Sequence, residues 1–366
     1  MNLLIYILLM ALFRLISEIS IVSTVAGYRT FTFNGVHEVR IRKSIHSLAD
    51  CATITLPAFS HVAVQGKSAV NRVSTRTIFN DGDAISINLG YSQDNTYNGL
   101  HNEFMGFIKS RGLGIPMVME CEGYVRQLRQ KVTVNKTFTG SNITTASHLL
   151  ALATAGTDVT VECPVDFKIS GVHLVNANGV QICDFIRQAS DRALTIYFKD
   201  PKTIWCGIVY TPYADGSNPL SGYTINYRVG WNCLRDNGLK VREPKEPVQV
   251  KYNGLLANGT AVETASKNKA AANKLKSLLS HVGGDKATMS SFAQEKEYSI
   301  NYTGYEGKLT GFLQPYCEPG MSIYLVDKQN SDMTGTYIIE GTEVTYGVRG
   351  ARRMIDVGPK LGFGRE

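Results

Sequence analysis

The sequence predicts a mainly β protein with a small α+β domain between two β-rich parts. Three observations support this prediction: apolar and polar residues alternate in many short runs, turn residues separate the runs, and helical spacing is confined to the middle of the chain. At 366 residues, the chain can form two or three compact units. We expect a first β domain over residues 1–122, an inserted α+β domain over 123–236 and a second β domain over 237–366.

The first domain is predicted to consist of short strands joined by turns. Apolar residues recur at period two through residues 28–56 on both sides of Asn34 and Gly35, which predicts a hairpin followed by another strand. Strands with the same alternation are expected at 84–91, 104–110 and 116–121, with turns at 80–83 and 111–114. Several short strands separated by turns are typical of a barrel or a sandwich.

The N-terminus allows two interpretations. Residues 3–13 form an apolar run followed by Arg14, and the small residues at 24–26 resemble a signal-peptide cleavage site. No Lys or Arg precedes the run, which is too short to span a membrane, and Met10 offers a second start. We favour a start at Met10, in which case residues 16–22 form the first strand.

The middle domain combines helices and strands. Apolar residues at helical spacing predict one helix over 143–153, capped by Ser141 or Asn142, and a second over 182–189. Strands are expected at 194–200 and 205–210.

The last third is again rich in strands. Residues 241–251 are strand-like but contain Pro244 and Pro247, and the polar stretch 258–285 gives no clear assignment beyond a helix or a mobile hairpin at 269–279. Turns at 318–320 and 330–335 separate antiparallel strands expected at 321–326, 337–339 and 344–346.

Charge and cysteine content exclude several functions. The net charge is +7, but the basic residues are spread out, and the two small clusters at 126–131 and 349–353 are typical of a solvated face or an interface rim rather than a nucleic-acid site. Seven widely spaced cysteines without a CxxC pattern indicate free thiols in a reducing compartment. These are Cys51, Cys121, Cys163, Cys183, Cys206, Cys233 and Cys317.

Catalytic chemistry has little support in the sequence. The seven histidines are isolated, and none of the usual hydrolase, zinc or nucleotide motifs occurs. Asp81 and Asp83 are interpreted as turn residues rather than metal ligands, and Glu120 and Glu122, which share a strand face, as edge or interface charges rather than a glycosidase pair. We therefore predict no catalytic, cofactor-binding or metal-binding residue.

One aromatic group has basic neighbours. Tyr223, Tyr227, Arg228 and Trp231 could stack on nucleic-acid bases, but without a compact basic patch such residues more often belong to a core or a subunit interface. We adopt the core or interface interpretation.

Three stretches resemble the tail hub family, which includes the central baseplate hub of contractile phages (the late control protein D-like proteins) and the hub part of type VI spike proteins. The first consists of residues 38–44 (EVRIRKS) and 48–57 (LADCATITLP), the second of 80–91 (NDGDAISINLGY), 106–108 and 117–122 (MVMECE). The third includes 304–307 (GYEG), 314–315, 319–327, 335–337 and 347–353 (GVRGARR).

The resemblance implies a structural protein of the virion tail tip or baseplate, assembled in the host cytoplasm. Each subunit would supply two tube-like β-barrel domains, so that a homotrimer forms a pseudo-hexameric ring between the six-fold tail tube and a three-fold spike. The implied partners are the tail tube protein, a spike or tail-tip protein, other baseplate subunits and the tape measure protein. DNA would only pass through the channel, and no stable membrane anchor is expected. Because no spike-like extension follows residue 358, the spike would be a separate chain.

Two other functions stay open. A secreted, adhesin-like surface protein would require cleavage near Ala26, and the free cysteines argue against it. A glycan-degrading tail enzyme would rely on acidic residues such as Glu120, Glu122 and Asp191, which form no recognisable constellation in the sequence.

Overall fold

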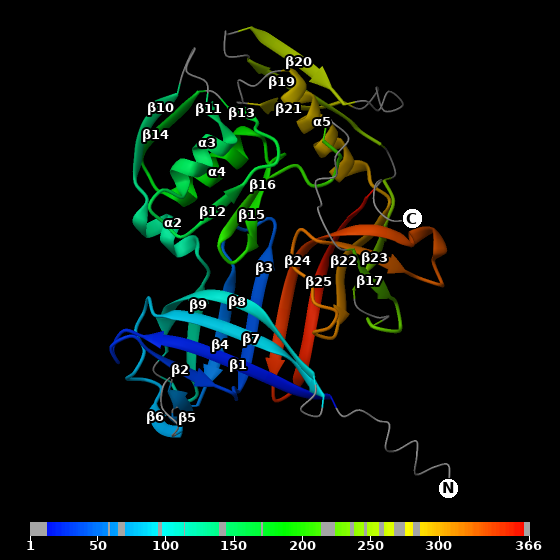
Figure 1. The fold of residues 1–366 in the computed structure, drawn as a ribbon. Coiled ribbons are helices and arrows are strands. Elements are labelled where there is room, and N and C mark those ends of the chain that lie inside the picture. The colour runs from blue at the N-terminus through cyan, green and yellow to red at the C-terminus, as the bar shows by residue number, and fades with distance from the viewer. Residues whose placement is uncertain are drawn as a thin grey trace.

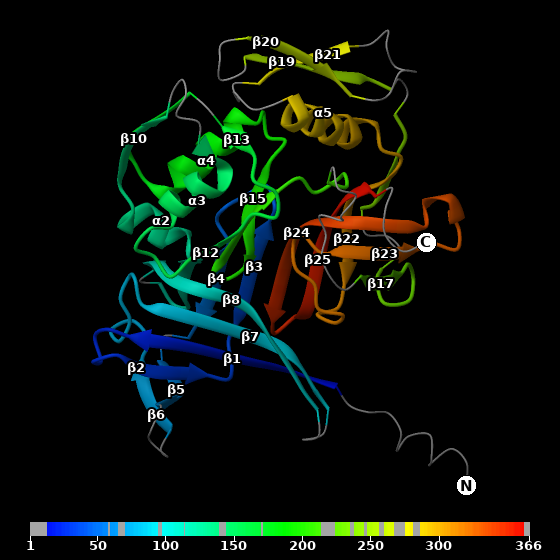
Figure 2. The ribbon, with the colours of Figure 1, turned by 45° about the horizontal axis from the view of Figure 1, so that its top comes forward.

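The computed structural model of the chain describes residues 13–361, except for 58, 65–69, 94–96, 113, 139–143, 170, 214–223, 235–237, 245–246, 256–259, 267–274 and 281–285. Strands account for 51% of the structure and helices for 16%, so the prediction of a mainly β protein with a small α+β part is confirmed. Figures 1 and 2 show the β-rich parts below and to the right, and the helices above them.

One sheet of fifteen strands runs through both β-rich parts. Its first half contains β1 (Phe13–Ser23), β2 (Arg29–Phe33), β3 (Glu38–Ser44), β4 (Cys51–Leu56), β5 (Phe59–Val64), β6 (Val70–Ser74), β7 (Ala84–Gln93), β8 (Tyr97–Arg111) and β9 (Met117–Glu122). Its second half contains β17 (Ile225–Arg228), β18 (Lys240–Arg242), β22 (Gly304–Gly311), β23 (Ser322–Val326), β24 (Gly335–Gly347) and β25 (Gly350–Lys360), with the short 3₁₀ helix Ser331–Met333 before β24. Among the strands described, the pairing does not close either half into a barrel.

The two halves are joined by the antiparallel pairing of β3 with β24, from Ser44 opposite Gly341 to Glu38 opposite Gly347. Strand β3 alternates strictly, with Val39, Ile41 and Lys43 buried and the residues between them exposed. This alternation turns one face of the strand towards the core. We call this strand pairing the seam.

Strand β1 lies inside the sheet between β2 and β7, as Figure 1 shows. Ile19 and Ile21 of β1 are fully buried in the core of the first half. The prediction of a strand over residues 16–22 is therefore confirmed, and the strand occupies a central rather than a marginal position.

The predicted hairpin at Asn34 and Gly35 is wrong. Strand β2 pairs with β1 and β5, whereas β3 pairs with β4 and β24, so the chain crosses between different parts of the sheet at residues 34–37. Alternation of apolar residues identifies strands but does not say which strands pair, and here the long-range partners determine the pairing.

The α+β unit comprises three helices and several short strands. The helices are α2 (Val125–Lys131), α3 (Ala146–Ala153) and α4 (Gly179–Ala189). The strands are β10 (Val134–Phe138), β11 (Thr144–Thr145), β12 (Thr160–Glu162), β13 (Lys168–Ile169), β14 (Val172–Ala177), β15 (Thr195–Asp200) and β16 (Thr203–Gly207). Both helices predicted here are present: Thr145 caps α3, and Asn178 with Gln181 forms a capping box on α4. Ser141 and Asn142, the expected caps, lie outside the described residues.

A further layer covers this unit and was not predicted. It consists of β19 (Gln249–Leu255), β20 (Ala261–Ala265), β21 (Leu275–Ser280) and the helix α5 (Lys286–Asn301). Phe292 of α5 packs against Phe167, with ring centroids 5.2 Å apart, and joins the core of the α+β unit. The described part of the 269–279 stretch is strand, so the helical alternative for it is wrong there.

Removal of residues 1–26 should prevent cooperative folding, because β1 and its pairing with both β2 and β7 would be lost. A chain that starts at Met10 keeps all of β1 and should unfold in one cooperative transition. Circular dichroism during thermal unfolding compares the two chains. A folded, cooperative chain without residues 1–26 would contradict the central role of β1.

Candidate functional site

Four charged side chains are buried beside the seam. The Lys43 ammonium on β3 lies 2.8 and 2.9 Å from the two carboxylate oxygens of Glu318, and Arg353 on β25 lies 2.6 Å from Glu103 on β8. Lys43, Glu318, Glu103 and Arg353 are at most 9% exposed. Each ion pair joins one residue of the first half of the sheet to one of the second, so the pairs fasten the halves together.

Further contacts surround these charges, although the buried Arg353 Nε has no hydrogen-bond partner among the described residues. Arg353 also donates to the carbonyl oxygens of Cys317 and Leu313, at 3.0 and 3.3 Å, and its guanidinium lies over the ring of Tyr316. The Tyr316 hydroxyl is within hydrogen-bonding distance of Glu318. A buried charge is tolerated when it has partners of this kind.

The environment shifts the pKa values of these groups. Burial alone would lower the pKa of Lys43, but the charges of Glu318 and Asp50 outweigh it and the pKa is raised. Burial raises the pKa of Glu103 against the opposing effect of Arg353. Burial alone would lower the pKa of Arg353, but the attraction and hydrogen bond of Glu103, together with the charges of Cys317 and Glu318, outweigh burial, and the pKa is raised. Both cations therefore stay charged at neutral pH.

Replacing Lys43 by Met should lower the free energy of unfolding by about 3 kcal/mol, because Glu318 would stay buried without its cation. In the double variant Lys43→Met/Glu318→Leu, the loss should be smaller than the sum of the two single losses. Denaturant unfolding of all four proteins measures this cycle. Additive losses would mean that the pair does not act as a unit.

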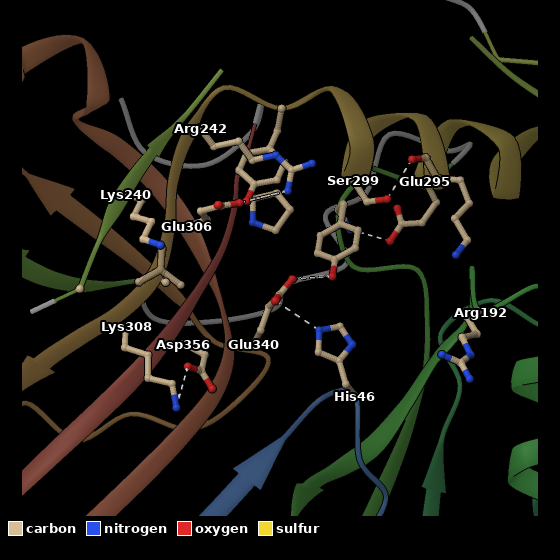
Figure 3. A pocket seen from close by; sticks show the side chains of 17 residues that line it. His46, Arg192, Lys240, Arg242, Glu295, Ser299, Glu306, Lys308, Glu340 and Asp356 are labelled. Atoms are coloured by element: carbon tan, nitrogen blue, oxygen red, sulfur yellow. Dashed lines mark hydrogen bonds and ion pairs between the residues drawn. The ribbon is translucent and has the colours of Figure 1, made fainter. Parts of the chain in front are cut away.

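A pocket of about 890 Å³ lies where the second half of the sheet meets α5 and the α+β unit (Figure 3). Glu340 on β24 accepts a hydrogen bond of 2.7 Å from the Tyr210 hydroxyl and lies 3.2 Å from the imidazole Nε2 of His46. Although burial acts in the opposite direction, these hydrogen bonds lower the pKa of Glu340.

Two further ion pairs lie around the pocket, whereas Arg192 and Lys240 also line it. Arg242 on β18 lies 3.4 Å from Glu306, and Lys308 on β22 lies 3.6 Å from Asp356. Arg242 also lies over the ring of Tyr302. Because the two partners of each ion pair neutralise one another, these pairs are suited to holding neighbouring elements together.

Glu295 of α5 lies at the edge of the pocket and is only 2% exposed. Its carboxylate accepts hydrogen bonds from the backbone N–H groups of Val209, Tyr210 and Thr211, at 2.7–3.0 Å, and from the Thr211 hydroxyl. Burial nevertheless raises the pKa of Glu295 to about 7. This single side chain attaches α5 to the segment that follows β16.

Because the pKa of Glu295 is higher in the folded than in the unfolded state, the folded protein binds more protons, and stability should fall as the pH rises towards 7. Between about pH 4.5 and pH 8, the titration of Glu295 should lower the free energy of unfolding by about 3 kcal/mol. In Glu295→Gln this part of the pH dependence should disappear. Denaturant unfolding at several pH values measures the slope, and an unchanged slope in the variant would contradict the assignment.

The acidic residues considered for catalysis are not brought together. Glu122 is buried and paired with Arg126 and Arg129 of α2, at 3.1 and 2.8 Å, whereas Glu120 is exposed beside Ser110. The first basic cluster thus pairs with a neighbouring strand. Asp191 follows α4 in the α+β unit.

Asp83 stabilises turns rather than a metal ion. Its carboxylate accepts hydrogen bonds from the backbone N–H groups of Asn80 and Thr24 and from the Thr24 hydroxyl. Asp81 is ion-paired with Arg111 at 2.9 Å. Within the described ranges, no three His, Cys, Asp or Glu side chains are placed to share a metal ion.

The aromatic residues Tyr227 and Trp231, which the sequence analysis grouped together, have different environments. Tyr227 is 1% exposed and belongs to the core of the second half, whereas Trp231 is 77% exposed and has the Arg228 guanidinium over its ring. Tyr223 lies outside the described residues. The sequence singled out the group that contains Trp231, but not the buried charges, which no local pattern indicates.

The cysteines are free thiols, five of them buried, and burial raises the pKa of Cys317 to about 11. No described helix is both long and apolar enough to cross a bilayer.

The fold is that of phage tail proteins, as the resemblance in the sequence predicted. A tail protein from Neisseria meningitidis aligns over 93% of this chain and 96% of its own, with a TM-score of 0.61 at 10% identity. The 43 kDa tail protein of prophage MuSo2 from Shewanella oneidensis aligns over 94% and 98%, with a TM-score of 0.55 at 10% identity. Prophage tail protein gp18 from Listeria monocytogenes aligns over 93% and 94%, with a TM-score of 0.53 at 9% identity.

By sequence alone, no family model and no curated protein matches the chain. The similarity is thus carried by the fold and extends over nearly the whole length of each tail protein.

Proposed function

We propose that this protein is a structural hub of a phage tail tip or baseplate, and that three copies form a ring with pseudo-six-fold symmetry. The observation that carries the proposal is the joining of two β-rich halves through the seam into one subunit. Two similar tube-like halves per subunit, with the α+β unit inserted between them, would let a three-fold assembly meet a six-fold tube. The near full-length similarity to three tail proteins supports the same function.

The proposed partners follow from this place in the virion. The ring would contact the tail tube protein on one side and a spike or tail-tip protein on the other, with baseplate subunits around it. Assembly would take place in the host cytoplasm, and DNA would pass through the ring without stable binding. The scattered basic residues, several of them already paired with acids, fit contact with proteins better than retention of DNA.

The alternatives have less support. Cleavage near Ala26, which a secreted adhesin requires, would remove β1 from the interior of the sheet. A glycan-degrading enzyme requires two carboxylates facing each other across a substrate, whereas Glu122 is held by two arginines. We therefore propose a non-enzymatic function.

The mass of the purified chain in solution tests the proposal. Light scattering should give three times the chain mass of 40.2 kDa, and negative-stain images should show rings with a six-fold outline. The apolar surfaces of a stable ring should keep the trimer intact at micromolar concentration. A folded protein that remains a monomer at high concentration would overturn the proposal.

A further inference from the structure

Large apolar side chains are exposed at two separate places on the fifteen-stranded sheet. The β1–β2 turn at residues 24–28 carries Val25 and Tyr28, which are 53% and 75% exposed; we call this the turn surface. The segment after β17, together with the end of β22, carries Trp231, Leu234 and Phe312, which are 77%, 51% and 47% exposed; we call this the tryptophan surface. Figures 1 and 2 show β1 and β2 reaching one side of the molecule, and β17 and β23 lying on the other.

The tryptophan surface is built from two neighbouring segments of the chain. The Leu234 backbone N–H donates to the Thr310 carbonyl at 2.8 Å, and Cys233 forms a bridge with Gly311, so the two segments run side by side. Arg228 lies over Trp231 and Arg352 lies over Phe312, with the guanidinium carbon 5.6 and 5.2 Å from the ring centroids. Exposed Trp and Arg side chains of this kind dominate binding energy at protein interfaces.

The turn surface is held in a strained conformation. Tyr28 has a φ of 62°, in the left-handed region that bulky side chains rarely adopt, and it follows Gly27 with a φ of 67°. The Tyr28 backbone N–H donates to the Ser23 carbonyl at 2.8 Å, and Asp83 fixes Thr24 with two further hydrogen bonds. These bonds hold the turn, but the tyrosine side chain itself is directed into solvent.

Strain at an exposed residue indicates a function outside the monomer, since glycine would form the same turn without strain. The two surfaces are also chemically complementary. The negative face of the Tyr28 ring suits the guanidinium groups of Arg228 and Arg352, and Val25 adds an apolar contact for Trp231.

We propose that the turn surface of one subunit docks on the tryptophan surface of a second copy of this chain. The two surfaces differ, so the contact is head-to-tail, and a three-fold rotation between neighbouring subunits would close it into a ring. This inference rests on the proposed function and adds the residues that form each junction of the ring.

Four variants test the proposal in the full chain, with mass measured by light scattering over a range of concentrations. Trp231→Ala and Tyr28→Lys should each raise the concentration at which trimers dissociate by at least about tenfold. Trp231→Ala removes a large side chain from the interface, and Tyr28→Lys places a positive charge against Arg228 and Arg352 of the neighbouring subunit. Tyr28→Gly should have the same effect on assembly while the monomer stays folded, since glycine relieves the strain. Val175→Ala is the matched control, because Val175 is also 77% exposed but lies on β14, away from both surfaces.

A triple variant tests whether the turn surface and the tryptophan surface contact each other. Adding Arg228→Glu and Arg352→Glu to Tyr28→Lys should restore trimers, because the new lysine would then face carboxylates on the neighbouring subunit. Failure to restore trimers would overturn the head-to-tail pairing.

The results separate this inference from the proposed function. If the unmodified chain is a trimer and Trp231→Ala or Tyr28→Gly leaves the dissociation concentration unchanged, the inference is overturned while the hub function stands. If the unmodified chain is a monomer, both are overturned.

Discussion

The position of every other part of the molecule depends on the seam between β3 and β24. On one face of it, Arg40 and Arg42 of β3 both reach Glu343 of β24, and on the other face Lys43 is buried against Glu318. The pairs of Glu343 with the half-exposed arginines contribute less, whereas the Lys43–Glu318 pair, buried on both sides, is costly to break because either charge would be left buried without its partner. The backbone hydrogen bonds between β3 and β24 and the buried Lys43–Glu318 ion pair together join two halves of the sheet that are distant in the sequence.

Local patterns in the sequence predicted a number of the strands and two of the helices, but missed others such as β5, β6 and β14. Alternation located β1, β7 and β9, and helical spacing located α3 and α4, because each of these elements turns one face to a core. Partners could not be predicted in this way, which is why the hairpin after β2 was wrong. Helix α5 was missed because its apolar residues are few and polar residues such as Glu295 are buried with them.

The candidate site shows the same limit. Lys43 and Glu318 are 275 residues apart, and Glu103 and Arg353 are 250 apart, so neither pair leaves a signature in the sequence. Arg353 looks like part of a surface cluster until the fold places it under Tyr316. Trp231 was recognisable because an aromatic residue beside an arginine suggests an interface even without a fold. Its exposure, and the strained Tyr28 of the turn surface, required the structure.

The seam also constrains how the chain is made. Arg40 and Glu343 are 303 residues apart, so β24 is synthesised long after β3. Until β24 has emerged from the ribosome, β3 can pair with β4 but has an unpaired edge on its other side. An open edge strand invites aggregation, and positive charges along it discourage wrong partners. Arg40 and Arg42, which finally meet Glu343, are therefore well placed to protect the nascent chain before β24 exists.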